Sequence, residues 1–206
     1  MSDLTSGLLQ ETAQSSFRVP VFLSYATPFN EQQTKFLERI IQEMYDNLLF
    51  PRTLGVSEQG FEPPLTSIRR IVLSSYGCLS VAFRRVLIRD VVSRPGTARE
   101  QVYTSGWLTS PYIQIEPSMA YQRGEPVMIL REDGVLNDGV FGGILEQGAA
   151  PLFIPVFSVD SDQLIDAFFN SIFWKDPFLR WVAAVREYYG ILTTPFPSIT
   201  SIPSIS

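Results

Sequence analysis

The sequence predicts an α/β fold in which a mainly parallel sheet of about five strands carries helices on both faces, with extra helices at the C-terminal end. Two observations carry this prediction. Short apolar runs typical of buried strands alternate along the chain with amphipathic segments of ten or more residues. The length of 206 residues fits one domain. Strands that alternate with helices in this order form a doubly wound, parallel sheet.

The strands are predicted from apolar runs that end in polar residues or turn signals. The first run, residues 19–23, is followed by Ser24 and Tyr25. The predicted strands are 19–23, a weaker 52–56, 78–83 with a possible continuation at 86–92, 127–130 and 153–157.

The helices are predicted from apolar residues at three- and four-residue spacing. They cover 30–49, 65–76, 111–123, 161–174 and 177–189. Asn30 suits the N-cap of the first helix, and Gly77 and Gly124 suit the ends of the second and third. Loops are expected at 57–64, 93–110 and 131–148, where Gly and Pro gather. The loop at 93–110 is long enough to indicate a functional role.

Composition excludes several kinds of site. The chain has no histidine and one cysteine, Cys78, which we expect in the core. It therefore has no Ser–His or Cys–His pair, no His-ligated or Cys-based metal site and no internal disulfide. Acid–base or electrostatic work must fall to carboxylates, Lys, Arg or Tyr. The net charge of −5 and the pI of about 4.8 disfavour nucleic acid as the main partner.

A single domain is expected at residues 17–192, between a polar leader at 1–16 and a Ser/Pro/Ile-rich tail at 193–206 that is loose or bound to a partner. The leader lacks the basic start and apolar middle of a signal peptide. No apolar run approaches the ~20 residues of a membrane span. With the single cysteine, these features indicate a cytoplasmic protein without a membrane partner.

One short stretch combines the features of a candidate active site. In a doubly wound sheet the ligand crevice lies beyond the C-terminal ends of the strands, so residues 24–29 should face the start of the helix at 111–123. That helix opens with Ser110-Pro111-Tyr112-Ile113-Gln114-Ile115-Glu116. Glu116 stands about one turn in, where the helix dipole favours an ionised carboxylate. Tyr112, four residues earlier, shares its face and offers an aromatic plate.

A carboxylate beside an aromatic plate suits cleavage at the anomeric carbon of a sugar that carries a flat base. Loss of the leaving group gives an oxocarbenium-like transition state. Glu116 could stabilise that positive charge or hold the ribose hydroxyls. A leaving group that is already cationic, as nicotinamide is in NAD, needs no general acid, which suits a chain without histidine.

The pattern Ser110-x-Tyr112-Ile113-x-x-Glu116 resembles the Ser-x-Trp-Cys-x-x-Glu motif of TIR domains, whose bacterial members commonly vary the Trp and Cys positions. The strand before Ser24-Tyr25 is similar to the first TIR strand, and residues 57–64 fall where the family has its BB loop. Residues 116–130 resemble the helix, Gly, Pro and strand that follow the family's glutamate. The resemblance covers roughly 19–157. It departs from the family at Tyr112, at Pro117 and in the length of 93–110.

This resemblance implies a flavodoxin-like fold and an enzyme in which Glu116 cleaves NAD, leaving ADP-ribose or a cyclic or conjugated ADP-ribose. NAD would be the substrate, with no separate cofactor. In bacteria such domains commonly act in defence against phage, by depleting NAD or by making a signal for a downstream effector. Self-association is typical, so we expect a homo-oligomer. Two alternatives stay open: a non-catalytic TIR-like interaction module, and an enzyme like the nucleoside deoxyribosyltransferases, which also use a glutamate in a doubly wound fold.

Other residues near the crevice have both a functional and a structural interpretation. Ser24 and Tyr25 border the ribose and base or simply end a strand. Phe29 stacks on a base or, as we expect, belongs to the core. Trp107 is a ligand plate or, with slight preference, a packing anchor. Because neighbouring strand residues point to opposite faces, at most one of Arg84 and Arg85 can meet a diphosphate. The candidate substrate-binding residues are Ser24, Tyr25, Phe29, Arg84, Trp107, Ser110 and Tyr112; no metal ligand is predicted.

Overall fold

The computed structural model describes residues 17–55, 57, 62–141 and 154–194. These residues form a five-stranded parallel sheet with the strand order β2-β1-β3-β6-β7. Its strands are β1 (Val19–Tyr25), β2 (Leu49–Arg52), β3 (Cys78–Ala82), β6 (Val127–Glu132) and β7 (Val156–Phe157). This is the order of a flavodoxin-like sheet, in which the chain reverses direction between the first and third strands. The predicted fold class is confirmed.

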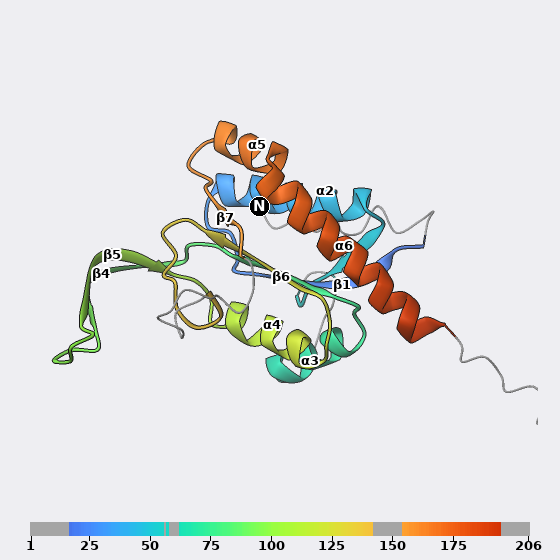
Figure 1. The fold of residues 1–206 in the computed structure, drawn as a ribbon, viewed down its shortest axis with the longest axis horizontal. Coiled ribbons are helices and arrows are strands. Elements are labelled where there is room, and N and C mark those ends of the chain that lie inside the picture. Colours follow the sequence, from blue (N-terminus) through green and yellow to red (C-terminus); the bar gives the residue numbers. More distant parts are fainter. Residues whose placement is uncertain (1–16, 56, 58–61, 142–153, 195–206) are drawn as a thin grey trace, which may run out of the picture.

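Helices cover both faces of the sheet (Figure 1). One face carries α2 (Glu31–Asp46), α5 (Asp162–Asn170) and α6 (Ile172–Thr193), and the other carries α3 (Pro64–Leu73) and α4 (Tyr112–Gln122). A short 3₁₀ helix, η1 (Gly139–Phe141), contacts α4. No helix in the described part of the chain is long and apolar enough to cross a membrane.

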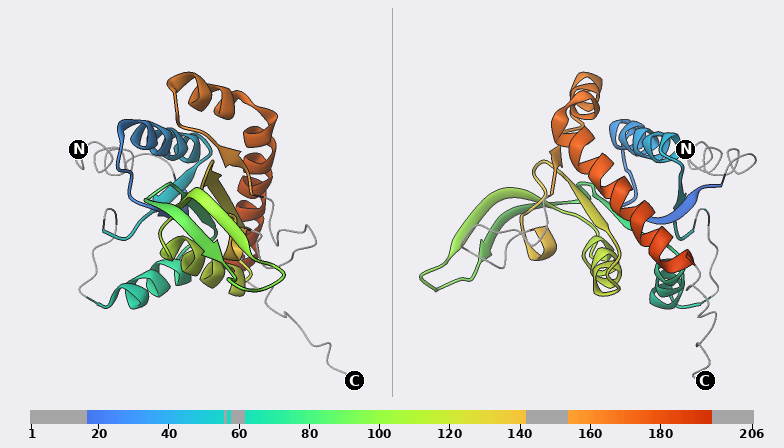
Figure 2. Two further views of the ribbon diagram at one scale, coloured as in Figure 1. Left: turned by 90° about the vertical axis from the view of Figure 1, so that its left-hand side faces the viewer. Right: turned by 45° about the vertical axis from the view of Figure 1, so that its right-hand side comes forward.

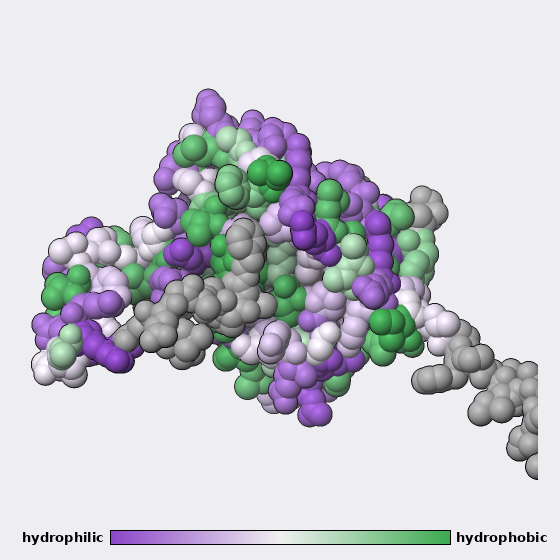
Figure 3. Space-filling model, in the orientation of Figure 1, coloured by the Kyte–Doolittle hydropathy of each residue, from purple (hydrophilic) through white to green (hydrophobic). Residues whose placement is uncertain are grey.

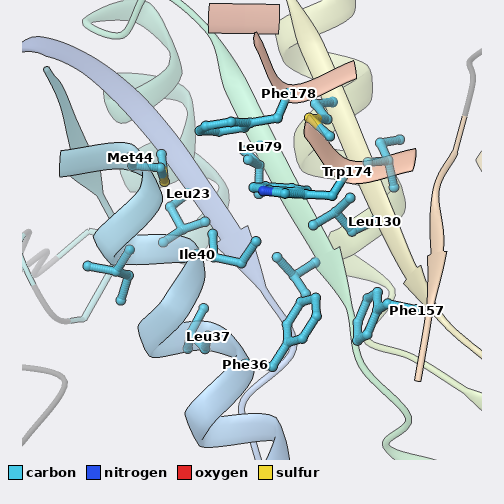
Figure 4. Packing of buried hydrophobic residues seen from close by; sticks show 14 of the residues in the cluster. Leu23, Phe36, Leu37, Ile40, Met44, Leu79, Leu130, Phe157, Trp174 and Phe178 are labelled. Atoms are coloured by element: carbon cyan, nitrogen blue, oxygen red, sulfur yellow. The ribbon is translucent and has the colours of Figure 1, made fainter. Parts of the chain in front are cut away.

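The larger core fills the space between the sheet and α2, α5 and α6 (Figure 4). Phe36 of α2 stacks on Phe157 with ring centroids 3.9 Å apart, and Trp174 stacks on Phe178 at 4.4 Å. All four rings are buried. The aromatic-rich C-terminal segment is therefore a packed cover of the sheet. A smaller core beneath α3 and α4 includes Cys78, as predicted.

The first helix and the strand after it are displaced from the predicted positions. Asn30 caps α2 as expected, its side chain accepting a hydrogen bond from the Gln33 N–H at 2.8 Å. The helix ends at Asp46 and the next strand is Leu49–Arg52, so the predictions of 30–49 and 52–56 were wrong at this junction. Leu48 and Leu49 suit helical spacing and strand equally well, and Leu48, with φ of 55°, breaks the helix between them.

The C-terminal helices are also divided elsewhere than predicted. The break falls at Ser171, whose hydroxyl accepts a hydrogen bond from the Trp174 N–H at 3.3 Å and caps α6. Pro177, which was taken to begin a helix, lies inside α6. A serine cap can start a helix as well as a proline can, and here the cap is used.

Gly77 has a role other than the predicted helix end. The helix α3 ends at Leu73 with Ser74 as its C-cap. A Cβ on Gly77 would lie 2.6 Å from Val185 Cγ2 of α6 and 3.3 Å from the Pro126 carbonyl oxygen. Glycine is therefore needed because α6 packs directly against the backbone at the start of β3.

This contact predicts that Gly77→Ala lowers the free energy of unfolding by about 2 kcal/mol, since the added methyl overpacks a full interface. Urea unfolding followed by circular dichroism measures the change. Gly190→Ala is the matched control, because Gly190 lies in α6 with open space around it. We expect that control to raise stability by about 0.5–1 kcal/mol. Equal effects at the two positions would contradict the close-approach explanation.

The largest departure from prediction concerns residues 86–108. The strands β4 (Val86–Ser93) and β5 (Gln101–Leu108) pair antiparallel to form a separate ribbon, the arm, which projects from the body (Figures 1 and 2). The prediction of a loop at 93–110, and of 86–92 as a continuation of β3, was wrong. Pro95, Gly96 and Gly106 look like loop signals, but only the first two lie in the turn.

Several predicted segments lie outside the described residues: the leader at 1–16, most of the loop at 57–64, residues 142–148 of the glycine-rich stretch, and the tail beyond Thr194. Gly124 ends α4 as predicted, with φ of 76°. The strand predicted at 127–130 continues to Glu132, and the one at 153–157 is described as Val156–Phe157.

Candidate active site

The side chain of Glu116 meets the end of the first strand. Ser24 of β1 donates its hydroxyl hydrogen to Glu116 Oε2, across 92 residues of sequence. The contact forms because α4 lies against β1 and β3, the two strands that flank the switch point of the sheet. In flavodoxin-like folds the ligand crevice opens at this point. The prediction that the end of β1 and the start of the 111–123 helix come together is confirmed.

A strip of small polar side chains lies on the sheet beneath α4. Ser24 is paired in register with Ser80 of the neighbouring β3, so the two side chains share one face. Ser80 Oγ lies 3.6 Å from Cys78 Sγ. All three are buried. Glu116 therefore rests on polar groups in an otherwise apolar layer, and burial raises the pKa of the Cys78 thiol so that it stays neutral.

Burial changes the electrostatic state of Glu116. Its residue is only 8% exposed. Loss of hydration raises the pKa of the carboxyl to about 7, and the hydrogen bond from Ser24 acts in the opposite direction. The predicted effect of the helix dipole is therefore outweighed by burial. A carboxyl that titrates near neutral pH within a sheet-edge site is a feature of functional residues, because water would otherwise keep it fully ionised.

The remaining motif residues differ in their surroundings. Ser110 is buried, and its carbonyl accepts the Ile113 N–H at 3.0 Å in the first turn before α4. Tyr112 is exposed, at the outer end of the same helix. Tyr25 is half-buried against the larger core, and burial raises the pKa of its hydroxyl. Ser24 and Glu116 therefore make the direct contact, while Tyr25 packs on the α2 side of the sheet.

Two aromatic residues form an exposed pair near the base of the arm. Phe29 is 58% exposed, so the expectation that it belongs to the core was wrong. Its ring stacks on that of Trp107, with centroids 6.1 Å apart and planes 20° apart. Trp107 is half-buried, and its backbone N–H donates to the Gly134 carbonyl at 3.0 Å. Phe29 follows β1 in the loop that leads to α2, too short a segment for periodicity to show its burial.

Arg84 is engaged by acidic side chains. Its Nη1 lies 3.1 Å from Asp160 Oδ1 and its Nε 3.5 Å from Glu132 Oε1. Its backbone N–H also donates to Glu132 Oε2 at 2.7 Å. The guanidinium is mostly buried in this network, so a diphosphate would have to compete with these carboxylates for it.

The partners of Arg84 include a buried pair that the sequence did not reveal. Glu132, at the end of β6, accepts a hydrogen bond from Gln33 Nε2 at 2.8 Å, and both residues are buried. Burial raises the pKa of Glu132, and the hydrogen bonds from Arg84 and Gln33 oppose that rise. Gln33 also accepts the Phe29 N–H at 3.0 Å. The pair thus anchors the loop after β1, and neither residue stood in a pattern that marks such a role.

The described cavities adjoin the motif from one side. A cavity of about 370 Å³ is lined by Trp107, Thr109, Ser110, Gln114, Val135 and Phe141, among others. A larger, mostly apolar one of about 760 Å³ lies between β6 and α6, away from Glu116. Glu116 itself points toward Ser24, beneath the sheet edge. Within the described ranges no cluster of three acidic or cysteine side chains could hold a metal ion.

The comparisons with known proteins found two remote structural likenesses. No family model and no curated protein match the chain. The TIR domains of the activated Roq1 resistosome, which directly recognises the pathogen effector XopQ, align with a TM-score of 0.36 and 12% identity over 84% of each chain. The CMP N-glycosidase BcmB of Clostridium botulinum aligns with a TM-score of 0.36 and 12% identity, over 72% of this chain and 95% of that one. Likenesses this distant carry no argument about chemistry, which must come from the site itself.

Proposed function

We propose that this chain cleaves the bond between nicotinamide and ribose in NAD, with Glu116 as the catalytic carboxylate. The observation that carries the proposal is the Ser24–Glu116 contact. It places a nearly buried carboxylate, with a pKa of about 7, at the switch point where flavodoxin-like folds bind ligands. The motif that resembles the TIR glutamate motif ends on this same residue.

The chemistry requires one negative charge in the right place. The bond between C1′ and the nicotinamide nitrogen breaks, and its electron pair leaves with nicotinamide and neutralises the ring. Positive charge then develops on the ribose C1′ and its ring oxygen. An ionised Glu116 would stabilise that charge strongly, because its surroundings hold little water. Water or a hydroxyl group adds to C1′ and loses a proton, which gives ADP-ribose or a cyclic or conjugated form.

Nearby groups offer surfaces for the rest of such a substrate. The exposed ring of Phe29 and the half-buried ring of Trp107 present aromatic faces suited to a flat base. Ser110 and Gln114 supply polar groups to the cavity at the start of α4. These contacts, like a role for Tyr25, Tyr112 and Arg84, are part of the proposal. So is a cellular role in defence against phage through NAD depletion or through a signal to an effector.

The decisive experiment is incubation of the purified chain with NAD, with nicotinamide measured by chromatography and the other product by mass spectrometry. Release of nicotinamide supports the proposal. Release of a base from nucleosides or nucleotides, with NAD left intact, would instead favour an enzyme like the nucleoside deoxyribosyltransferases. No release from any of these substrates, even at high protein concentration, would favour an interaction module.

The pKa of Glu116 predicts the pH dependence of this activity. If the ionised carboxylate is the active form, kcat/KM should rise about tenfold per pH unit below pH 7 and level off above it, because kcat/KM reports the free enzyme. Ser24→Ala should move the midpoint to higher pH, since the hydrogen bond from Ser24 lowers the pKa of Glu116. Nicotinamide release at a series of pH values measures both effects.

Ser118→Ala is the control for that series. Ser118 is an exposed serine of the same helix, and its hydroxyl donates to the Gln114 carbonyl at 2.6 Å. Its removal should leave the midpoint unchanged. A Ser24→Ala midpoint equal to that of the wild type would mean that Glu116 is not the group that titrates.

A further inference from the structure

The arm formed by β4 and β5 has an unusual position for a ribbon of its length. Each strand has eight residues, and neither belongs to the five-stranded sheet. Its base is held to the body, where the Leu136 N–H donates to the Trp107 carbonyl at 2.9 Å. Beyond the base it extends away from the helices and sheet (Figures 1 and 2). A two-stranded ribbon alone is marginally stable in water, so an arm of this kind gains stability from a partner.

One face of the arm carries exposed aliphatic side chains. Val92 lies directly opposite Val102, and Val86 directly opposite Leu108, so all four share a face. They are between 43% and 65% exposed. The middle of this face, at Gly106, is covered by Leu136. We call Val86, Val92, Val102 and Leu108 the apolar arm face. Aliphatic pairs left in water on a projecting ribbon indicate a contact surface.

The charge of the arm differs in sign from that of the rest of the chain. Residues 85–108 contain four arginines and two acidic residues, a net charge of +2. The whole chain has a net charge of −5, so the remaining residues carry −7. Hydrophobic and strongly hydrophilic residues lie side by side on the arm (Figure 3). A basic arm on an acidic body is complementary to another body of the same kind.

We propose that the arm docks on the body of a second copy of this chain, in a reciprocal contact that forms a dimer. A reciprocal contact satisfies both arms at once, as two-fold symmetry requires. A ribbon of eight-residue strands is about 26 Å long and about 10 Å wide, so one face covers about 250 Å². Counted on arm and body and for both arms, the contact buries about 1,000 Å², which is enough for a specific interface.

The contact would also bear on the candidate active site, because β5 runs directly into the start of α4. Only Thr109 separates Leu108 from Ser110. Trp107, at the base of the arm, stacks on Phe29 and lines the cavity beside Ser110. The proposal concerns assembly and does not depend on the reaction, since its test reads mass and not turnover.

Two neighbouring residues of β5 provide the test. Val102 belongs to the apolar arm face, while Gln101 is exposed on the opposite face. Val102→Asp and Gln101→Asp add the same charge to the same strand. Sedimentation velocity over a concentration series should show wild-type mass rising from 23.2 kDa toward twice that value. We expect Val102→Asp to raise the dimer dissociation constant at least tenfold and Gln101→Asp to change it less than about threefold. Added NaCl should weaken the wild-type dimer, since opposite charges attract the arm.

Three results would overturn this proposal. The first is a wild type that stays monomeric at every concentration. The second is a dimer that both substitutions, or neither, weaken. The third is a monomeric wild type that binds a fluorescent DNA duplex through the arm, which would make nucleic acid the partner of this basic ribbon. Circular dichroism of each variant confirms that the fold is retained.

Discussion

Glu116→Gln is expected to lower the rate of nicotinamide release from NAD by at least about a hundredfold. The amide keeps the shape of the side chain and can still accept the hydrogen bond from Ser24, but it carries no negative charge. A preorganised charge in a site with little water contributes several kcal/mol to stabilising an oxocarbenium-like transition state, and its loss appears in kcat. The measurement is nicotinamide release at pH 8, where Glu116 of the wild type is mostly ionised.

The chain offers a close control for this substitution. Glu125 is a second buried glutamate whose pKa burial raises to about 7, and its carboxylate lies 2.9 Å from Arg123 Nη1. It follows α4 at the end opposite Glu116. Glu125→Gln therefore makes the same chemical change in a similar environment and should retain the wild-type rate. Wild-type turnover by Glu116→Gln would remove Glu116 from the reaction, and equal loss in both variants would point to a general effect of removing a buried charge.

The same substitution should make the protein more stable above neutral pH, by about 3 kcal/mol at pH 8. In the unfolded chain a glutamate titrates near pH 4.3, whereas burial raises the pKa of Glu116 in the fold to about 7. Below pH 4 both states are protonated and the wild type loses nothing. As pH rises from about 4.5 to 7 the unfolded chain ionises first, so the wild type loses stability, and above pH 7 the loss is constant. Glutamine does not ionise and escapes this cost.

Urea unfolding at pH 8 and at pH 4 separates this effect from others. The difference between Glu116→Gln and the wild type should appear at pH 8 and vanish at pH 4. Glu187→Gln, at an exposed position of α6, should change little at either pH. A wild type as stable as Glu116→Gln at pH 8 would show that the carboxylate is not held in a costly environment. Both large predictions together describe a residue that lowers stability and is retained for its charge.

The sequence predicted the helices and most strands because their signals are local. Apolar spacing and the Asn30 cap identify α2 within 16 residues of sequence, and the Ser110–Glu116 pattern marks the start of α4. Boundaries failed where two local signals competed. Leu48 and Leu49 suited either a helix or a strand, and Pro177 competed with Ser171 as a helix start.

The arm shows why a loop signal can mislead. Gly106 suggested irregular backbone, yet it lies within β5, where a side chain would meet Leu136 Cδ2 at 2.8 Å. The glycine therefore serves a close approach between segments 30 residues apart, which no window of sequence contains. The same holds for Gly77 against α6. Phe29 failed in the opposite direction, because an apolar residue in a short loop carries no periodicity to show whether it is buried.

By itself the sequence determined the alternation of strands and helices, the lack of histidine and the motif that ends at Glu116, since each is a property of composition or of neighbouring residues. Only the tertiary structure decided that Ser24 donates to Glu116 across 92 residues, that Arg84 is bound by Asp160 and Glu132, and that residues 86–108 form a projecting ribbon. The pKa of Glu116 belongs to this second group. It depends on how much water the packing of α4 against β1 and β3 leaves around the carboxylate, and burial of that kind is set by contacts between distant segments.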